Sequence, residues 1–413
     1  METKFIWLTA FVGIYWAYCL FWGFKGARTA KTSTDYFLAG RSIGVWVFVL
    51  AATATSFSGW TFVGHPGKIF TDGLPYAFAS FYALTIPFTG VLFLRRQWVL
   101  GRAYNYITPG EMYSDYYGGN AMRLLTVLVA FLFSVPYLGV QLKASGSLFN
   151  VLSDGFISVN LGMFALTTVV VIYVASGGLK SVAYVDCAQA ILLAVGIVIL
   201  GGIALHYSGG WNGFTSGLAN IVMKDVSTGQ NLTPDGYSMK VALPGSIQMV
   251  SAGAKAAGGA WTGIMCMTYM FALMGIQSSP AFSMWAFANK TPQAFRWQQV
   301  IASSLIVGII LFTFTIFQGL GAHILVENGV LKNITDTNLI PELINLLSVA
   351  APWLVGLLAV CALAAMQSTG SAYMSTFSAM VTRDIYARYI SPDASDNSQK
   401  NIGRIFVVLV AGA

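Results

Sequence analysis

The chain has 413 residues, of which 56% are hydrophobic and only 9% are charged. A soluble domain of this length does not need so apolar a sequence, whereas repeated spans of about 20 apolar residues do. The formal net charge is +7, but the basic residues are spread over several loops, which argues against a nucleic-acid-binding surface. The four cysteines lie far apart and show neither metal-ligand nor disulfide spacing. These features indicate an integral membrane protein.

Ten segments are apolar and long enough to be candidate membrane spans, at residues 5–24, 43–65, 74–94, 121–149, 157–176, 183–205, 261–285, 297–320, 350–382 and 402–413. We interpret the first as a retained span, because it has no convincing small-residue cleavage site. The last reaches Ala413 in mid-span, so we expect the chain to continue beyond this residue.

Most of the 22 Lys and Arg residues lie on alternate loops between these spans. They follow the first, third, fifth, seventh and ninth spans, at Lys25, Arg28, Lys31, Arg41, Arg95, Arg96, Arg102, Arg123, Lys180, Lys290, Arg296, Arg383, Arg388, Lys400 and Arg404. Because cytoplasmic loops are enriched in basic residues, this pattern predicts a multi-pass protein of the cell (inner) membrane with its N-terminus outside.

The second span contains small polar residues and glycines that are poorly suited to a continuous helix. Its residues 51–67 include Ser56, Ser58, Gly59, Gly64 and Pro66. Unwound backbone at membrane depth is tolerated only where it is buried in protein or lines a watery cavity, and there its carbonyls can coordinate an ion or a solute. The segment therefore predicts a broken helix and a transporter.

A second interruption occurs at residues 275–280, where Gly275 and Pro280 break another apolar segment. Broken helices at corresponding positions of two halves indicate the midplane site of a transporter. Two polar stretches, 206–260 and 321–349, are expected to be outer loops that carry short surface helices.

Three residues of the ninth span, Ala365, Ser368 and Thr369, share one helix face because they are spaced i, i+3 and i+4. A sodium ion needs about five or six hard oxygen ligands. Two hydroxyls and one carbonyl from this face, with two carbonyls from an unwound helix, would form such a cage. The alternative is that the hydroxyls only hydrogen-bond neighbouring helices, as they often do in membrane bundles.

Four motifs along the chain resemble those of the sodium:solute symporter family. They are DYFLAGRS at 35–42, SFSGW at 56–60, GGLKSVAYVDCAQAILL at 177–193 and AAMQSTGSA at 364–372. The family includes bacterial proline, pantothenate, sialic-acid and monocarboxylate symporters and the animal sodium–glucose cotransporters.

The resemblance implies an all-α integral membrane protein with two inverted five-helix repeats, a leucine-transporter-type core, behind one extra N-terminal helix. Residues 1–42 would hold the extra helix and a cytoplasmic loop, 43–205 the first repeat, 206–260 an extracytoplasmic loop, and 261–413 an incomplete second repeat. The family's sodium site corresponds to the carbonyls of Ala54, Phe57 and Ala365 and the hydroxyls of Ser368 and Thr369.

A further sodium site is present in some family members and would involve Asp186 and Ser371 here. The last hydroxyl position of that site is Ala372 in this chain, which argues against a second sodium ion. The alternative is that Asp186 lies in the first turn of a helix, where the helix dipole favours a carboxylate.

The residues expected to contact the solute come from four spans. The resemblance implies Ser56, Ser58, Thr61, Tyr137, Ala272, Gln277 and Pro280, and Gln141 and Lys143 are further candidates on the 121–149 span. Lys143 could pair with a substrate carboxylate, or it could extend to the membrane interface.

The sequence therefore predicts a symporter that imports a small organic solute, an amino acid or a monocarboxylate, by alternating access. Its partners are the solute, the co-transported sodium ion and the lipid bilayer. The alternative is a sensory domain fused to or associated with a kinase. A membrane enzyme is not expected, because the sequence contains no catalytic triad, metal cluster or nucleotide-binding glycine motif.

Overall fold

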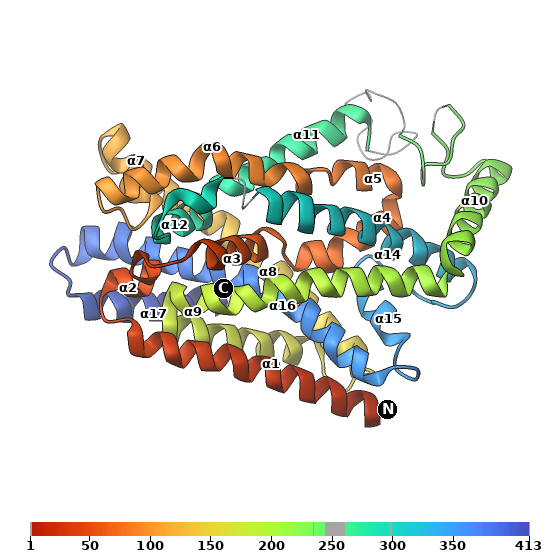
Figure 1. The fold of residues 1–413 in the computed structure, drawn as a ribbon, viewed down its shortest axis with the longest axis horizontal. Coiled ribbons are helices and arrows are strands. Elements are labelled where there is room, and N and C mark those ends of the chain that lie inside the picture. The colour runs from red at the N-terminus through yellow and green to blue at the C-terminus, as the bar shows by residue number, and fades with distance from the viewer. Residues whose placement is uncertain (1, 234, 244–260, 297–299, 413) are drawn as a thin grey trace.

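The computed structural model describes residues 2–233, 235–243, 261–296 and 300–412, and helices dominate it (Figure 1). Two isolated β-bridges, Ile43 with Asn289 and Leu232 with Ser238, are the exceptions among the described residues. Parts of the expected 206–260 loop and the first residues of the expected 297–320 span lie outside the described residues.

The helical elements follow one another along the whole described chain. They are α1 (Glu2–Thr29), α2 (Ser33–Leu38), η1 (Ala39–Arg41), α3 (Val45–Ser56), η2 (Trp60–Gly64), α4 (His65–Asp72), α5 (Leu74–Ala79), α6 (Tyr82–Ala103), α7 (Pro109–Tyr117), α8 (Ala121–Leu152), α9 (Val159–Tyr207), α10 (Gly210–Thr228), α11 (Gly263–Met274), η4 (Gly275–Ser278), α12 (Pro280–Ala288), η5 (Pro292–Phe295), η6 (Val300–Gly308), α14 (Ile309–Glu327), α15 (Leu339–Asn345), α16 (Pro352–Met380), η7 (Val381–Ile390) and α17 (Asp396–Gly412).

The expectation of several membrane spans is confirmed, although fewer helices than the ten expected segments are long and apolar enough among the described residues. Within the described residues, 5 helices are long and apolar enough to cross a membrane, or up to 6 if one bent pair is a single span. The longest of them, α9, has 49 residues and contains two of the spans expected from the sequence. The short helices α10 and α15 lie on the two expected outer loops.

Gly178 divides α9 into two arms. Its φ of 60° is a left-handed conformation that glycine adopts without steric cost. A Cβ atom here would lie 2.2 Å from the carbonyl oxygen of Tyr36, so the close approach of α2 also requires glycine. The two expected spans therefore meet in a direct turn, at the end of the bundle that carries α2 (Figure 1).

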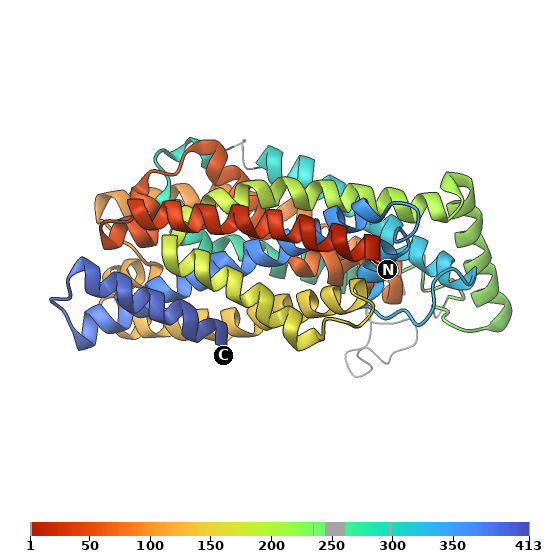
Figure 2. The same ribbon diagram turned by 90° about the horizontal axis from the view of Figure 1, so that it is seen from below.

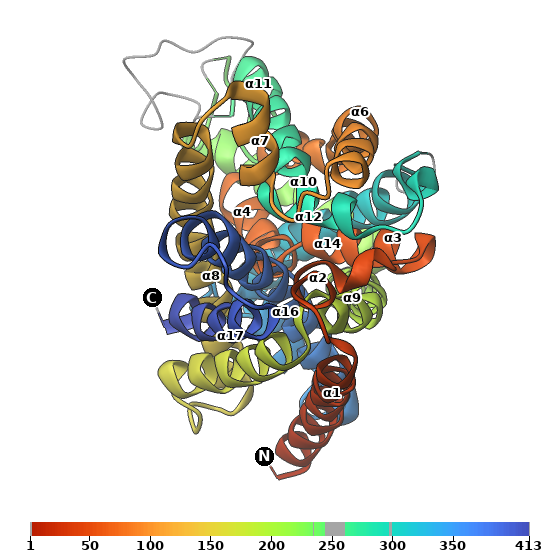
Figure 3. The ribbon, with the colours of Figure 1, turned by 90° about the vertical axis from the view of Figure 1, so that its left-hand side faces the viewer.

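Helix α16 lies near the centre of the bundle, as the view along the bundle shows (Figure 3). It packs against α1, α3, α8 and α9, and nearly all of its residues are buried. Small residues permit this packing: a Cβ atom on Gly356 would lie 2.5 Å from the backbone oxygen of Trp7 in α1. The element predicted to bind sodium is therefore surrounded by protein.

Helix α1 lies along α9 on one side of the bundle (Figure 2). Its first turn is held by Lys4, whose ammonium lies 2.8 Å from the Asp154 carboxylate and donates to Asn345 at 3.1 Å. Asp154 follows α8, and Asn345 ends α15. These contacts connect the start of α1 to two other parts of the bundle.

Candidate functional site

The first predicted helix break is confirmed. Helix α3 ends at Ser56, Phe57 has an extended backbone with φ −106° and ψ 97°, and the π-helical turn η2 begins at Trp60. The axes before and after the break differ by 54°. Residues 51–58 are all buried, so their freed backbone groups face protein.

The second predicted break is also confirmed, and it lies beside the first. Helix α11 ends at Met274, the 3-10 turn η4 follows, and Ser279 is extended before α12 begins at Pro280. The Gln277 amide donates to the Ser56 hydroxyl at 3.2 Å. This hydrogen bond connects the two interruptions directly.

Three of the predicted sodium ligands lie on α16, and a fourth, Ala54, contacts one of them. The Ser368 hydroxyl lies 3.0 Å from the carbonyl oxygen of Ala54 and 3.2 Å from that of Ala365. The Thr369 hydroxyl is fully buried and has no hydrogen-bond partner among the described residues. Phe57 lies in the unwound turn itself. Neutral oxygens of this kind, one of them unpartnered in the interior, suit a hard monovalent cation carried as cargo.

Gln141 of α8 forms a hydrogen bond with the backbone at the first helix break. Its side-chain oxygen accepts a hydrogen bond from the backbone N–H of Gly59 at 2.8 Å, and the side chain is buried. A Cβ atom on Gly59 would lie 2.6 Å from this oxygen, so glycine is needed for the contact. Gln141 therefore supplies the acceptor that a continuous helix would have given to Gly59. Its oxygen thus already accepts one hydrogen bond from the protein backbone, and Gln141 stays a candidate contact of the solute.

Gln141→Leu is expected to raise the sodium concentration for half-maximal uptake several-fold, because it leaves the buried Gly59 N–H without an acceptor beside the unwound turn. Gln141→Glu keeps an acceptor and should recover part of the loss. The measurement is uptake as a function of sodium concentration. Equal sodium dependence of the leucine variant and the wild type would contradict this positioning role.

The expected solute residues are brought together only in part. Ser56, Ser58 and Thr61 are buried along the first break, and Gln277 contacts Ser56. Tyr137 is half-buried, and its ring lies 5.4 Å from that of Tyr373 in an edge-to-face contact.

The sequence analysis missed Tyr373. Its hydroxyl lies 3.5 Å from the Ser279 hydroxyl beside the second break. The available signal was its spacing, i+4 from Thr369 on the same helix face.

Two further expected solute residues have exposed side chains. Ala272 is exposed on α11, and Lys143 is exposed on α8. An exposed Lys143 fits the alternative in which its side chain extends to the membrane interface.

Asp186 is fully buried in the second arm of α9, two turns beyond the Gly178 break. The prediction that it lies in the first turn of a helix is therefore wrong, because this arm begins directly after Gly178 and not near residue 183. The Ser371 hydroxyl lies 3.4 Å from one carboxylate oxygen and 3.0 Å from the carbonyl oxygen of Ser368. The other oxygen of Asp186 has no partner within the described part of the chain.

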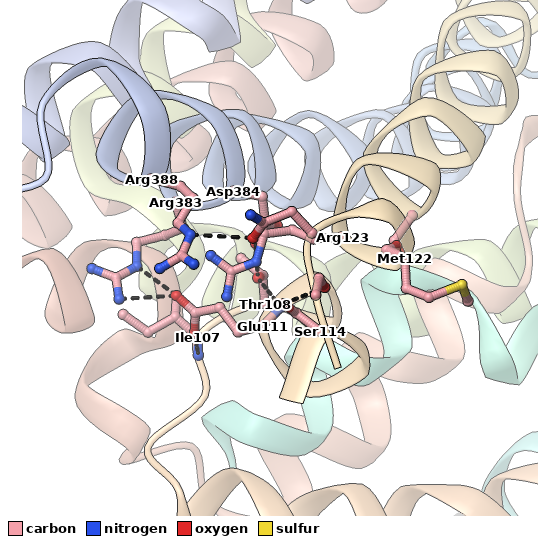
Figure 4. Close-up of polar contacts among 12 residues, drawn as sticks. Ile107, Thr108, Glu111, Ser114, Met122, Arg123, Arg383, Asp384 and Arg388 are labelled. Carbon is pink, nitrogen blue, oxygen red and sulfur yellow. Dashed lines mark hydrogen bonds and ion pairs between the residues drawn. The ribbon is translucent and has the colours of Figure 1, made fainter. Parts of the chain in front are cut away.

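A buried cluster of charges, which the sequence analysis did not identify, lies where α7, the start of α8 and η7 meet (Figure 4). Asp384 is fully buried, accepts a hydrogen bond from the Thr108 hydroxyl at 2.9 Å, and lies 3.6 Å from the Arg123 guanidinium. Beside it, Arg383 donates to Glu111 at 2.9 Å. The cluster holds α7 against the continuation of α16.

Comparison with known proteins identifies the family. The sodium:solute symporter family matches residues 36–413. The chain belongs to the sodium:solute symporter family. It is thus a multi-pass membrane transporter and not an enzyme, and the predicted resemblance is confirmed.

Curated relatives are about 25% identical to this symporter over the aligned residues. The sodium/proline symporter of Salmonella typhimurium is 25% identical over 401 residues, which cover 94% of this chain and 72% of the relative. The sodium/glucose cotransporter of Vibrio parahaemolyticus is 25% identical over 396 residues, with 92% and 68% covered. The chain is therefore a sodium-coupled solute symporter of this family. At this level of identity, the relatives do not determine which solute it carries.

Solved structures share the fold. A Na⁺-coupled sialic acid symporter in a substrate-bound, outward-open state matches with a TM-score of 0.78 and 17% identity, covering 99% of this chain and 80% of the other. MhsT in complex with L-phenylalanine matches with a TM-score of 0.54 and 14% identity, covering 88% and 78%. The symporter therefore has the helical fold of these two transporters.

Proposed function

We propose that this symporter imports a small organic solute, an amino acid or a monocarboxylate, together with sodium by alternating access between the two helix breaks. The observation that carries this proposal is the junction of α3 and α16, where the Ser368 hydroxyl meets two backbone carbonyls beside the buried, unpartnered Thr369 hydroxyl. We assign the sodium ion to the carbonyls of Ala54, Phe57 and Ala365 and the hydroxyls of Ser368 and Thr369.

The solute would lie against the two breaks. Ser56 and Gln277 already form a hydrogen bond there, and Tyr137 and Tyr373 provide an aromatic wall. Separation of Ser56 from Gln277 would free two hydrogen-bonding groups for a polar solute. The side chains are modest and uncharged, which favours a small solute over a large sugar.

The gradient supplies enough energy for accumulation. Each sodium ion that moves into a negative interior gains about 2.3 kcal/mol per 100 mV. Because about 1.4 kcal/mol corresponds to a tenfold ratio, one coupled ion supports some tens-fold accumulation of a neutral solute. The distribution of basic residues over the loops favours an orientation with the N-terminus outside and α2, α7 and η7 on the cytoplasmic side. The two inverted repeats, proposed at 43–205 and 261–413, would move about the shared site.

The relatives named above are symporters or cotransporters and give no support to the alternative of a kinase-linked sensor. Uptake into proteoliposomes under an inward sodium gradient tests the solute class, with labelled proline, other amino acids, monocarboxylates and glucose. Accumulation of an amino acid or a carboxylate is expected. Accumulation of glucose alone would contradict the proposed solute class.

Asp186→Asn is expected to leave the coupling at one sodium ion per solute, as in the wild type. Asp186 has the Ser371 hydroxyl as its one hydrogen-bond partner among the described residues, and Ala372 offers no side-chain oxygen. The chain thus lacks one of the side-chain oxygens that the resemblance implies for a further sodium site. The measurement is the reversal potential of the transport current. A wild-type value that corresponds to two sodium ions per solute would instead make Asp186 a ligand.

A further inference from the structure

A small pocket lies between the last turns of α1 and the second arm of α9, and none of its lining residues belongs to either helix break. Its volume is about 180 Å³, and its lining includes Trp22, Lys25, Thr29, Lys180 and Tyr184. The lining thus includes two lysines and a threonine beside a space large enough for a phosphate group. The pocket lies at the end of the bundle where α1 ends and the two arms of α9 meet.

The two lysines have no acidic partner. Neither Lys25 nor Lys180 forms an ion pair or a side-chain hydrogen bond among the residues that the structure describes. Other basic side chains at this end do have acceptors: Lys400 donates to the carbonyl oxygen of Lys31 at 2.5 Å, and Arg404 to that of Ala175 at 3.1 Å. Two like charges on one small pocket repel each other unless an anion lies between them.

An aromatic wall fixes one side of the pocket. The rings of Trp22 and Tyr184 are stacked, with centroids 4.4 Å apart and an interplanar angle of 4°. The Lys25 ammonium lies 4.4 Å from the Trp22 ring centroid, a cation–π distance that holds this lysine at the pocket. The pocket is therefore built from packed side chains and is not a loose group of surface lysines.

The surroundings of the pocket point to a lipid. Phe21 and Phe24, on the same turns of α1, are each 57% exposed. Exposed apolar side chains in a membrane-spanning helix face acyl chains, while tryptophan, tyrosine and lysine at its end lie at the level of the headgroups. Basic pockets between helices on the cytoplasmic side bind anionic headgroups.

We propose that this pocket binds the phosphate headgroup of an anionic glycerophospholipid, with Lys25 and Lys180 as its charge partners and the Trp22–Tyr184 pair as its wall. The lipid would hold the end of α1 against α9, the helix that carries Asp186. This site is independent of which solute the symporter carries.

Native mass spectrometry of the purified full chain tests the proposal, with dioleoylphosphatidylglycerol or dioleoylphosphatidylcholine added in detergent. The wild type is expected to retain phosphatidylglycerol in preference to phosphatidylcholine. Lys25→Ala/Lys180→Ala should weaken this retention about tenfold or more. Lys25→Arg/Lys180→Arg should restore it, and millimolar inorganic phosphate should not compete.

The matched control is Arg95→Ala/Arg96→Ala, which removes two exposed basic residues from α6 without touching the pocket. Equal loss of phosphatidylglycerol in the control and the lysine variant would overturn the proposal in favour of unspecific charge attraction. Displacement by inorganic phosphate would make the pocket a site for a soluble anion. Thermal unfolding without added lipid should be the same for both double variants, and a lower midpoint for the lysine variant alone would make the lysines structural and overturn the proposal.

Discussion

Alanine at both Ser368 and Thr369 is expected to raise the sodium concentration for half-maximal uptake about tenfold or more. The double variant removes two of the five oxygens assigned to the ion, and a hydrogen bond or contact to a charged group contributes about 1.5–3 kcal/mol. Because both side chains are fully buried, water cannot easily replace the lost ligands. The measurement is the initial rate of solute uptake as a function of sodium concentration.

The control for this variant is Ser145→Ala/Thr315→Ala. These hydroxyls are also fully buried, but they donate to Leu142 and Leu311 of their own helices. The control removes the same two chemical groups from the membrane interior without touching the assigned site. If the control and the Ser368/Thr369 variant shift the sodium dependence equally, the assignment of these two ligands is wrong.

Arg123→Met is expected to destabilise the protein by about 3 kcal/mol, because it removes the guanidinium that pairs with the buried Asp384 carboxylate and leaves only Arg383, which is already paired with Glu111, as a positive charge in the cluster. The Arg123 side chain is 11% exposed and the Asp384 side chain 0%, so solvent cannot easily compensate for the lost charge. Thr108 would remain as a hydrogen-bond donor to Asp384, but a neutral hydroxyl does not offset a buried carboxylate. The measurement is the free energy of unfolding in detergent.

Two comparisons separate this effect from the loss of any arginine. Arg123→Met/Asp384→Asn should recover much of the stability, because no unpaired charge remains in the cluster. Arg95→Met, at an exposed position of α6, should have little effect. Unfolding of the single Arg123 variant at the same denaturant concentration as the wild type would show that the pair does not stabilise the fold.

Both helix breaks could be predicted from the sequence because their cause is local. Gly59, Gly275 and Pro280 weaken a helix wherever they occur, and serine at membrane depth gives the unwound backbone alternative partners. The helix face formed by Ala365, Ser368 and Thr369 could likewise be predicted from helical spacing alone. Burial of this face at the centre of the bundle agrees with that interpretation.

The remaining features depend on contacts between segments far apart in the chain. Gln141 lies 82 residues from Gly59, and nothing in its own helix indicates that its oxygen replaces a missing backbone acceptor. Asp384 and Thr108 are separated by 276 residues. The position of Asp186 in its helix was predicted wrongly because the sequence suggested a loop up to residue 183. In the structure the chain turns at the single residue Gly178, so the second arm starts earlier and Asp186 lies two turns into it.

Sodium-dependent uptake by the full chain in proteoliposomes tests the coupling most directly. With an identified solute, uptake should saturate with external sodium and fall to background when potassium or choline replaces sodium at constant ionic strength. The Ser368→Ala/Thr369→Ala variant should then require a higher sodium concentration for the same rate. Unchanged uptake in potassium or choline would contradict sodium coupling at the junction of α3 and α16.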